Sequence, residues 1–562
     1  MRKERRPRAA PGLACAEHSE GSGSGPLPEP GSAGCRALLR EVCSCCGGGW
    51  WACCAACRGA APLVPTMALS WALRLPCRHL RPLSALLRSL PGRDHSLLTE
   101  KTAAKQKEKK KPEKGCSLPG SSWEERTLLQ VKYESQRKIL QTLASRLKEL
   151  GVDVQQPDGL CCPLQPVVPS PVITGYRNKS TFSVNRGPDG NPKTVGLYVG
   201  TGRARNIVCV KANQVENIPS KHKLVAQCYE DFIHHSPLDS CILFHEGGHW
   251  RELVVRTTSR GHTMAIVTFH PQELGQEALA MQKALLKEFF TCGPGRVCAL
   301  TSLYFQESTM TRCSHEQSPF QLLHGEPHIF EEVLGLKFRI SPDAFFQVNT
   351  GGAEVLYQTV GELSQAGGDT ILLDICCGTG TIGLSLAHRV SKVIGIEVVA
   401  KAIEDARWNA AFNGISNCEF HGGKAEAVLP QLLSSWEGPQ PLVTVVNPSR
   451  AGLHSSVQFC DACCARIPSG ECMVMVGQWE STVSVFADYR VVRAIRNCKS
   501  IRRLLYISCK PEGEAMRNFL ELCCPPNPQK KLSGASFTPT LAIPFDMFPH
   551  TVHCELVLLF TR

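Results

Sequence analysis

The stretch that decides the fold is TILLDICCGTGTIG, residues 370–383. Its first half has the apolar run of a buried strand, and its second half opens a helix. Between them, Gly378 and Gly380 let the backbone approach a ligand without a Cβ clash, and the helix start offers free N–H groups. Asp374 stands just before this loop. We therefore predict a strand, a glycine-rich ligand loop and a helix, in that order.

Downstream of the loop the chain alternates between strand-like and helix-like segments. The strand-like runs are KVIGIEV (392–398), CEFH (418–421), LVTVVNPS (442–449), RLLYISC (503–509) and CELVLLFTR (554–562). Such alternation predicts a doubly wound α/β sheet with a Rossmann-like order. Glu397 ends the strand after the loop, where a carboxylate can accept hydrogen bonds from ribose hydroxyls.

The loop alone fits two cofactors. GTGTIG matches the GxGxxG dinucleotide pattern with Gly378, Gly380 and Gly383. However, Asp374 can hold a methionine amine, and a sulfonium needs no pyrophosphate cradle. The loop therefore favours S-adenosylmethionine, and a dehydrogenase remains an alternative.

The upstream chain predicts a smaller α+β domain, because residues 172–335 alternate short strand-like runs with turns around one helical stretch near 275–290. A helix is expected from Ser122, where Ser122 and Glu125 fit a capping box. The predicted units are a low-complexity Cys/Gly-rich extension (1–66), a presequence and basic linker (67–120), a helix and Pro-rich joint (121–160), an α+β RNA-binding domain (161–335) and a catalytic domain (336–562).

The net charge of +12 invites a nucleic-acid partner, but its position weakens that argument. Residues 1–114 carry a net charge of +11, which leaves +1 for the remaining chain. Basic runs such as 203–205 and 499–503 are then the local candidates for an RNA contact. The 30 cysteines include many adjacent pairs, which predicts reduced thiols inside a cell. The sequence contains no run of about 18 uncharged apolar residues, so we predict no membrane span.

Residues 67–93 have the composition of a mitochondrial presequence. They contain five arginines and no acidic residue, with leucines and serines between them. A start at Met67 would place this signal at the N-terminus, whereas a start at Met1 makes it internal. We predict a mitochondrial matrix protein, with a generic basic tail as the alternative.

Three later segments carry chemistry: NPSRAG (447–452), YISCKP (506–511) and DMFPHTVHCE (546–555). The first two lie at the carboxyl ends of predicted strands, where open α/β sheets bind ligands. Together with GYRNKSTFSV (175–184) and SPDAFFQVN (341–349), they resemble the RNA (uracil-5-)-methyltransferase family over roughly 170–562. The resemblance is strongest to mitochondrial-type vertebrate members.

The resemblance implies a covalent mechanism with S-adenosylmethionine as cofactor and tRNA or ribosomal RNA as substrate. Cys509 would add to C6 of uracil, and Glu555 would remove the C5 proton. Phe345 would lie near the target base, and Arg450 would favour the thiolate or hold a phosphate. The cofactor set, from the loop and the resemblance together, is Gln347, Asp374, Cys376, Gly378, Gly380, Thr381, Glu397 and Asn447.

Two departures from the family pattern keep a noncatalytic RNA-binding protein open as an alternative. Asn447 replaces the Asp of a DPPR pattern, and about 457–490 is an insertion. The chain lacks the CxxxxxCxxC grouping of iron–sulfur members, so we expect no cluster and no metal. An amino-methyltransferase would need an aromatic after NPP, where Ser449 and Arg450 stand, and a cytosine-C5 enzyme differs around its cysteines.

Overall fold

The computed structural model describes residues 125–154, 156–200, 208–241, 247–309, 318–434, 436, 438–449, 453 and 490–562. The predicted extension, presequence and Ser122 cap lie outside these residues. Most of the predicted insertion lies outside them as well.

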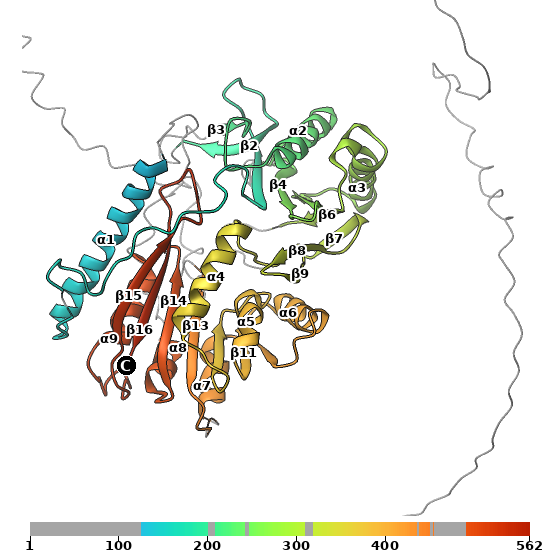
Figure 1. Cartoon of the computed structure of the whole chain (residues 1–562). Helices are drawn as coiled ribbons and strands as arrows, with labels where there is room; N and C mark the ends of the chain where they lie inside the picture. The colour runs from blue at the N-terminus through green and yellow to red at the C-terminus, as the bar shows by residue number, and fades with distance from the viewer. Residues whose placement is uncertain are drawn as a thin grey trace, which may run out of the picture. The chain divides into compact units, whose positions relative to one another are not determined.

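A seven-stranded, mainly parallel sheet forms the C-terminal part of the chain (Figure 1). Its order is β12-β11-β10-β13-β14-β16-β15. The pairs from β12 to β14 are parallel, and β16 runs antiparallel to both β14 and β15. The direction of winding reverses beside β10, which opens a crevice at the carboxyl ends of the strands. The predicted Rossmann-like fold is therefore confirmed. The strands are β10 (Ile371–Ile375), β11 (Lys392–Glu397), β12 (Cys418–Gly422), β13 (Leu442–Val446), β14 (Ile501–Ser508), β15 (Thr538–Phe545) and β16 (Glu555–Thr561).

Both faces of this sheet are covered, because its side chains alternate between two apolar cores. In β10, Leu372 packs into one core, while Ile371 and Leu373 pack into the other. The first core includes α4 (Thr350–Ser364), α5 (Thr381–Leu386) and α6 (Ala400–Phe412). The second includes α7 (Ala425–Ser434), α8 (Arg490–Asn497) and α9 (Glu514–Cys523).

A second seven-stranded sheet, of order β3-β2-β1-β4-β5-β6-β7, precedes the first. Its pairs are antiparallel except for β5 and β6. Only one helix was predicted here, and that prediction was incomplete, because α2 also packs on the sheet through Tyr229 and Phe232. The elements are β1 (Lys179–Asn185), β2 (Thr194–Val199), β3 (Val208–Val210), α2 (Ser220–His235), β4 (Trp250–Thr257), β5 (Thr263–Phe269), α3 (Gln276–Thr291), β6 (Ser302–Glu307) and β7 (Phe320–Gly325).

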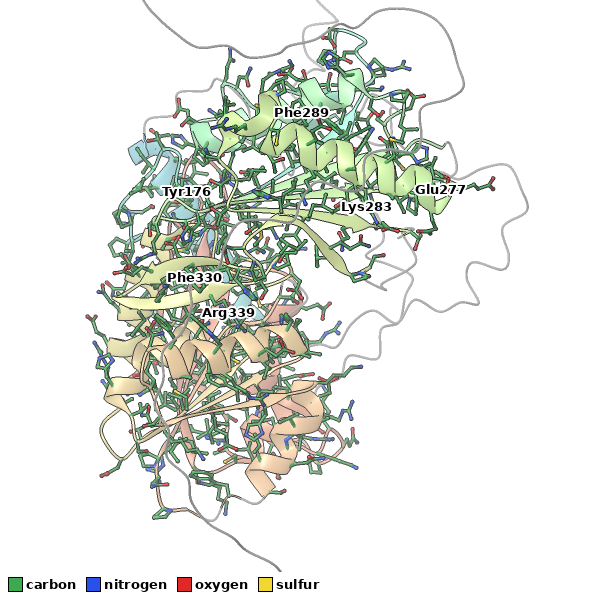
Figure 2. All side chains as sticks on the ribbon, turned by 90° about the vertical axis from the view of Figure 1, so that its right-hand side faces the viewer. Tyr176, Glu277, Lys283, Phe289, Phe330 and Arg339 are labelled. Carbon is green, nitrogen blue, oxygen red and sulfur yellow. The ribbon has the colours of Figure 1, made fainter. Side chains whose placement is uncertain are left out.

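A β-hairpin lies between the two sheets in the sequence and packs against α6. It consists of β8 (Ile329–Val333) and β9 (Leu336–Ile340). Arg339 lies on β9 of this hairpin (Figure 2). The Arg339 Nε lies 2.7 Å from Oδ1 of the buried Asp405 of α6. This contact fixes the hairpin beside the segment that leads into α4.

Helix α1 (Glu125–Glu149) packs on the C-terminal sheet and not on the sheet that contains β1 to β7. Its stripe of Leu140, Leu143 and Leu147 is fully buried in the core that also contains Phe519 of α9. The joint that follows runs along β15, where the Val168 N–H donates to the Pro544 carbonyl at 2.8 Å. The chain therefore contributes to the catalytic unit before it builds the α+β sheet, and then returns to it.

Candidate active site

The glycine-rich loop between β10 and α5 requires its glycines. The backbone has a positive φ at Cys376 (64°), Gly378 (55°) and Gly380 (80°). A Cβ at Gly380 would also come within 3.1 Å of the Phe420 ring. Side chains at these glycines would be strained, so the loop keeps its backbone open toward a ligand.

Asp374 is a buried acid at the end of β10. Its Oδ2 accepts the Gly383 N–H at 2.9 Å, and within the described chain Oδ1 is buried without a hydrogen-bond partner. Burial raises the pKa of this carboxyl from 3.8 to about 7. An orphaned acceptor of this kind would gain from a cationic donor, so the site fits the amine of a bound amino-acid cofactor.

Glu397 closes the other side of the loop. Its Oε2 accepts the Gly378 N–H at 3.0 Å, and its Oε1 accepts the N–H groups of Val398 and Val399 at 2.9 and 3.0 Å. These three donors fix the carboxylate at the end of β11 and leave about one of its four lone-pair sites for a hydroxyl donor. On the first turn of α5, the Thr381 hydroxyl lies 3.2 Å from the Tyr357 hydroxyl.

Asn447 and the loop meet at the same edge of the sheet. The Asn447 N–H donates to the Ile375 carbonyl at 3.2 Å, and the Cys376 N–H donates to the Ile396 carbonyl at 2.9 Å. The ends of β10, β11 and β13 are thereby locked together. Arg450 lies outside the described residues.

Cys509 and Glu555 lie at the same end of two neighbouring strands. β14 ends at Ser508, which pairs with Leu556 of the antiparallel β16, so Cys509 directly follows the last residue pair and Glu555 begins β16 beside it. Cys509 is half-buried and Glu555 is buried. Because β14 is parallel to β13, this pair lies at the same sheet edge as Asn447.

The segment before α4 carries Phe345 and Gln347 and is held by residues of the α+β domain. Asn178 donates its side-chain amide to the Gln347 carbonyl at 2.7 Å, and the Arg256 guanidinium donates to the Ala344 carbonyl. Gln347 is buried, whereas 64% of Phe345 is exposed. An exposed aromatic on an anchored segment offers a stacking face to a planar ligand.

Basic side chains gather beside this segment on β1 and β4. Lys179 pairs with Arg256 in the strand register, and Arg177 precedes them. Burial, together with these like charges, lowers the pKa of Lys179 to about 8. The basic runs predicted from the sequence are not part of this group. Arg503, from the run at 499–503, lies near the start of β14, at the end opposite Cys509, and its guanidinium donates to the Leu363 carbonyl. Residues 203–205 lie outside the described residues.

Sequence reasoning missed Asn178 and Arg256, because neither belongs to a motif that names a chemical role. Asn178 and Lys179 do lie in the GYRNKSTFSV segment on which the resemblance rested. Among the described residues, no group of three His, Cys, Asp or Glu side chains could hold a metal, and no helix is long and apolar enough to cross a membrane.

The sheet order, the glycine-rich loop and the orphaned Asp374 define a Rossmann-like, S-adenosylmethionine-dependent methyltransferase. A methyltransferase domain model matches residues 367–437. The chain is 56% identical to mouse tRNA (uracil-5-)-methyltransferase homolog B, over 85% of this chain and 94% of the mouse protein. It is 58% identical to the zebrafish homolog B, over 77% and 83% of the two chains. The chain belongs to the RNA (uracil-5-)-methyltransferase family, and its methyl donor is S-adenosylmethionine.

A solved structure is also similar to this chain. The Pyrococcus abyssi tRNA (uracil-54, C5)-methyltransferase, in complex with S-adenosyl-L-homocysteine, is 22% identical with a TM-score of 0.47. The match covers 76% of this chain and 83% of that one.

Replacing Asp374 by Asn should separate stability from cofactor binding. The unfolded chain loses the Asp374 proton near pH 4, but the folded protein keeps it to about pH 7. The free energy of unfolding of the ligand-free wild type therefore falls as pH rises from 4 to 7. The Asn variant has no carboxyl to ionise there, so its free energy of unfolding does not fall for this reason. At pH 8 it should exceed that of the wild type by about 1–2 kcal/mol, and at pH 4 the two should be nearly equal. S-adenosylmethionine should bind at least about tenfold more weakly.

Thermal unfolding at pH 4 and pH 8, with calorimetric titration of the cofactor, checks both effects. A variant that is no more stable at pH 8 would show that the buried carboxyl carries no cost.

Proposed function

We propose that this enzyme methylates C5 of uridine in tRNA or ribosomal RNA through a covalent adduct on Cys509, in the mitochondrial matrix. The observation that supports the chemical part is the pairing of Ser508 with Leu556, because Cys509 follows the first of these residues and Glu555 precedes the second, at the carboxyl end of β14. A nucleophile and a base within reach of one base ring are what C5 methylation needs.

The proposed reaction has three bond-making steps. The Cys509 thiolate adds to C6, and the electron pair of the C5–C6 double bond moves to leave an enolate with electron density on C5. The C5 electron pair then forms a C–CH₃ bond with the electrophilic methyl group that S-adenosylmethionine would supply when bound, as the S–CH₃ bond of the sulfonium breaks and its electron pair stays on sulfur as a neutral thioether. The Glu555 carboxylate then accepts the C5 proton, the C5=C6 bond reforms and the C6–S bond breaks to release the thiolate.

The substrate must be presented as a flipped base, because C5 and C6 are covered within a stacked strand. The exposed Phe345 supports a stacking role on the target base. Arg177 and Lys179 support contacts to neighbouring phosphates, which fix register and orientation. Arg450 is proposed to hold a phosphate or to favour the thiolate.

The cofactor roles are proposals of the same kind. Asp374 binds the methionine amine, Glu397 binds the ribose, and Gly378 and Gly380 give the ligand access to the backbone. Gln347, Cys376, Thr381 and Asn447 complete the proposed set. As an uncharged amide, Asn447 can still donate and accept hydrogen bonds there.

The test uses the purified protein with methyl-labelled S-adenosylmethionine and unmodified transcripts of tRNA and mitochondrial ribosomal RNA. The proposal expects label in 5-methyluridine after digestion to nucleosides, and the labelled transcript identifies the substrate. RNA binding without any transfer would overturn the proposal in favour of the noncatalytic alternative, with Asn447 and 457–490 as the first suspects.

The proposed compartment has its own test. A fluorescent fusion beginning at Met67 should enter mitochondria, and a matched fusion beginning after residue 93 should not. Equal distribution of the two fusions would remove the presequence argument, which rests on the composition of 67–93.

A further inference from the structure

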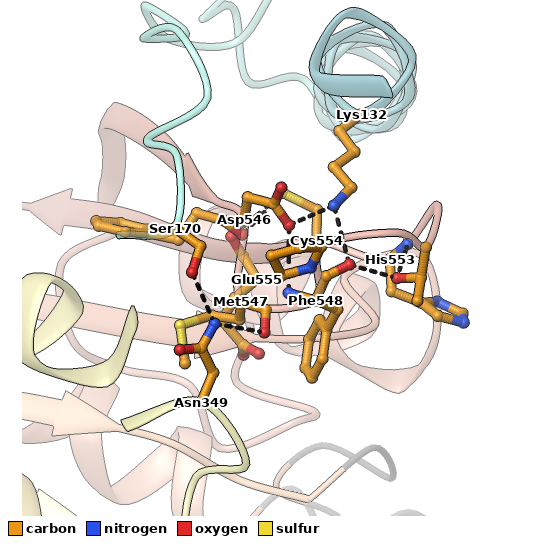
Figure 3. A network of polar contacts seen from close by, with 12 residues as sticks. Lys132, Ser170, Asn349, Asp546, Met547, Phe548, His553, Cys554 and Glu555 are labelled. Carbon is orange, nitrogen blue, oxygen red and sulfur yellow. Dashed lines mark hydrogen bonds and ion pairs between the residues drawn. The ribbon is translucent and has the colours of Figure 1, made fainter. Parts of the chain in front are cut away.

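Helix α1, about 400 residues earlier in the chain, contacts the turn at 546–548 that leads toward Glu555. Lys132 of α1 forms a buried ion pair with Asp546, and its ammonium also donates to the Phe548 carbonyl at 3.1 Å (Figure 3). Lys132 is completely buried, and Asp546 is 3% exposed. The same Asp546 oxygen accepts the Phe548 N–H at 3.2 Å, so one carboxylate organises the turn after β15.

Other contacts hold the same segment. The Asn349 amide donates to the Met547 carbonyl at 3.2 Å and to Ser170 Oγ at 2.9 Å (Figure 3). The Tyr176 hydroxyl donates to the Pro549 carbonyl at 3.1 Å. These bonds are neutral, whereas the contact from α1 is charged.

A buried ion pair is weak evidence for stability. Removing two charges from water costs several kcal/mol per ion, and well-packed apolar residues often serve stability as well or better. The position of the pair suggests another reason for it. Asp546 directly follows Phe545, and Phe545 pairs with Glu555 in the register of β15 and β16. A displacement of Asp546 would therefore move Phe545, the adjacent residue in the chain, and with it the strand partner of Glu555.

We infer that Lys132 is a positioning residue for Glu555, acting through Asp546 and the turn at 546–548. This inference rests on the proposed role of Glu555 as the base. Lys132 touches no reacting atom. It holds the strand end in place so that the carboxylate meets the C5 proton after methyl transfer.

The inference assigns the defect to one step. If Glu555 is displaced, Cys509 can still add to C6 and C5 can still receive the methyl group. Proton removal then slows, the C6–S bond persists, and methylated RNA stays attached to the protein. A structural defect alone would reduce the folded fraction without changing the adduct per folded molecule.

The test variant is Lys132→Met with Asp546→Asn, which removes both charges and leaves no unpaired buried ion. The Asn oxygen can still accept the Phe548 N–H. The matched control is Lys138→Met, an exposed lysine on the same helix. The reference variant is Glu555→Gln, and each protein is compared with wild type by thermal unfolding, kcat, KM for RNA, and the fraction of labelled, SDS-resistant protein–RNA adduct.

We expect kcat of the double variant to fall about tenfold or more, KM to stay within about twofold, and the methyl-labelled adduct to accumulate, as in Glu555→Gln. Lys138→Met should match wild type. If Glu555→Gln traps adduct but the double variant turns over normally, the inference is overturned alone. If Glu555→Gln traps none, the proposed base is wrong.

A second double variant, Lys132→Gln with Asp546→Asn, covers the case of poor folding, because it also leaves no buried ion without a partner. Rates normalised to the folded fraction must still show adduct accumulation. A loss of activity that merely tracks the folded fraction in both variants would overturn the positioning role.

Discussion

Cys509→Ala should eliminate methyl transfer to RNA while S-adenosylmethionine still binds. Without a thiolate, C6 gains no adduct and C5 stays a poor nucleophile, so kcat should fall on the order of 10⁴-fold or more. The cofactor loop is held by β10 and β11, and the bonds at Asp374 and Glu397 do not involve Cys509. Cofactor affinity should therefore change by less than about threefold. Single-turnover transfer from labelled cofactor, with calorimetric titration, measures both quantities.

The matched control is Cys418→Ala, because Cys418 is also half-buried but begins β12, an edge strand that β11, β10 and β13 separate from β14. This control should keep wild-type turnover. Label transfer by the Cys509 variant at more than a few per cent of the wild-type rate would exclude the covalent route.

The second large effect concerns stability, at a buried arginine far from the chemistry. Arg496 of α8 is fully buried, and its guanidinium donates to six oxygen acceptors as well as to the Cys524 Sγ. The oxygen acceptors are the carbonyls of Glu521, Leu522, Cys524, Gly534 and Ala535 and the hydroxyl of Ser536. Arg496→Met removes one donor from each of these acceptors, although the carbonyls of Leu522, Cys524 and Ala535 each keep another donor. The free energy of unfolding should therefore fall by about 3 kcal/mol.

Urea unfolding followed by circular dichroism and by tryptophan fluorescence measures this loss. The matched control is Arg502→Ala, since Arg502 is an exposed arginine at the start of β14 and should change stability by less than about 0.5 kcal/mol. A loss below about 1 kcal/mol in the Arg496 variant would mean that water or neighbouring groups replace the guanidinium.

The sequence predicted the parts of the site that local patterns encode. The loop at 376–380 was readable because glycine spacing and a preceding buried strand are signals within one short segment. The alternating strands and helices gave the sheet for the same reason. The helix α2 was missed because turn-rich segments on either side of it dominated the interpretation, although Val225, Tyr229 and Phe232 have helical spacing.

Contacts between distant segments were beyond local reasoning. The meeting of Cys509 and Glu555 depends on the register of β14 and β16, which no motif states. The burial of Lys132 was hidden in the same way, because a lysine in an amphipathic helix ordinarily faces water. Only its acidic partner, several hundred residues away, makes that burial tolerable.

The path of α1 has a consequence for biosynthesis. On the ribosome, its leucine stripe emerges long before α9, the helix against which it finally packs. Such a late partner gives the nascent chain a high contact order and leaves an apolar surface open in the meantime. The catalytic unit can close only when the last strand has been translated. Chains that lack α1 or the last strand should consequently depend on chaperones and be degraded quickly.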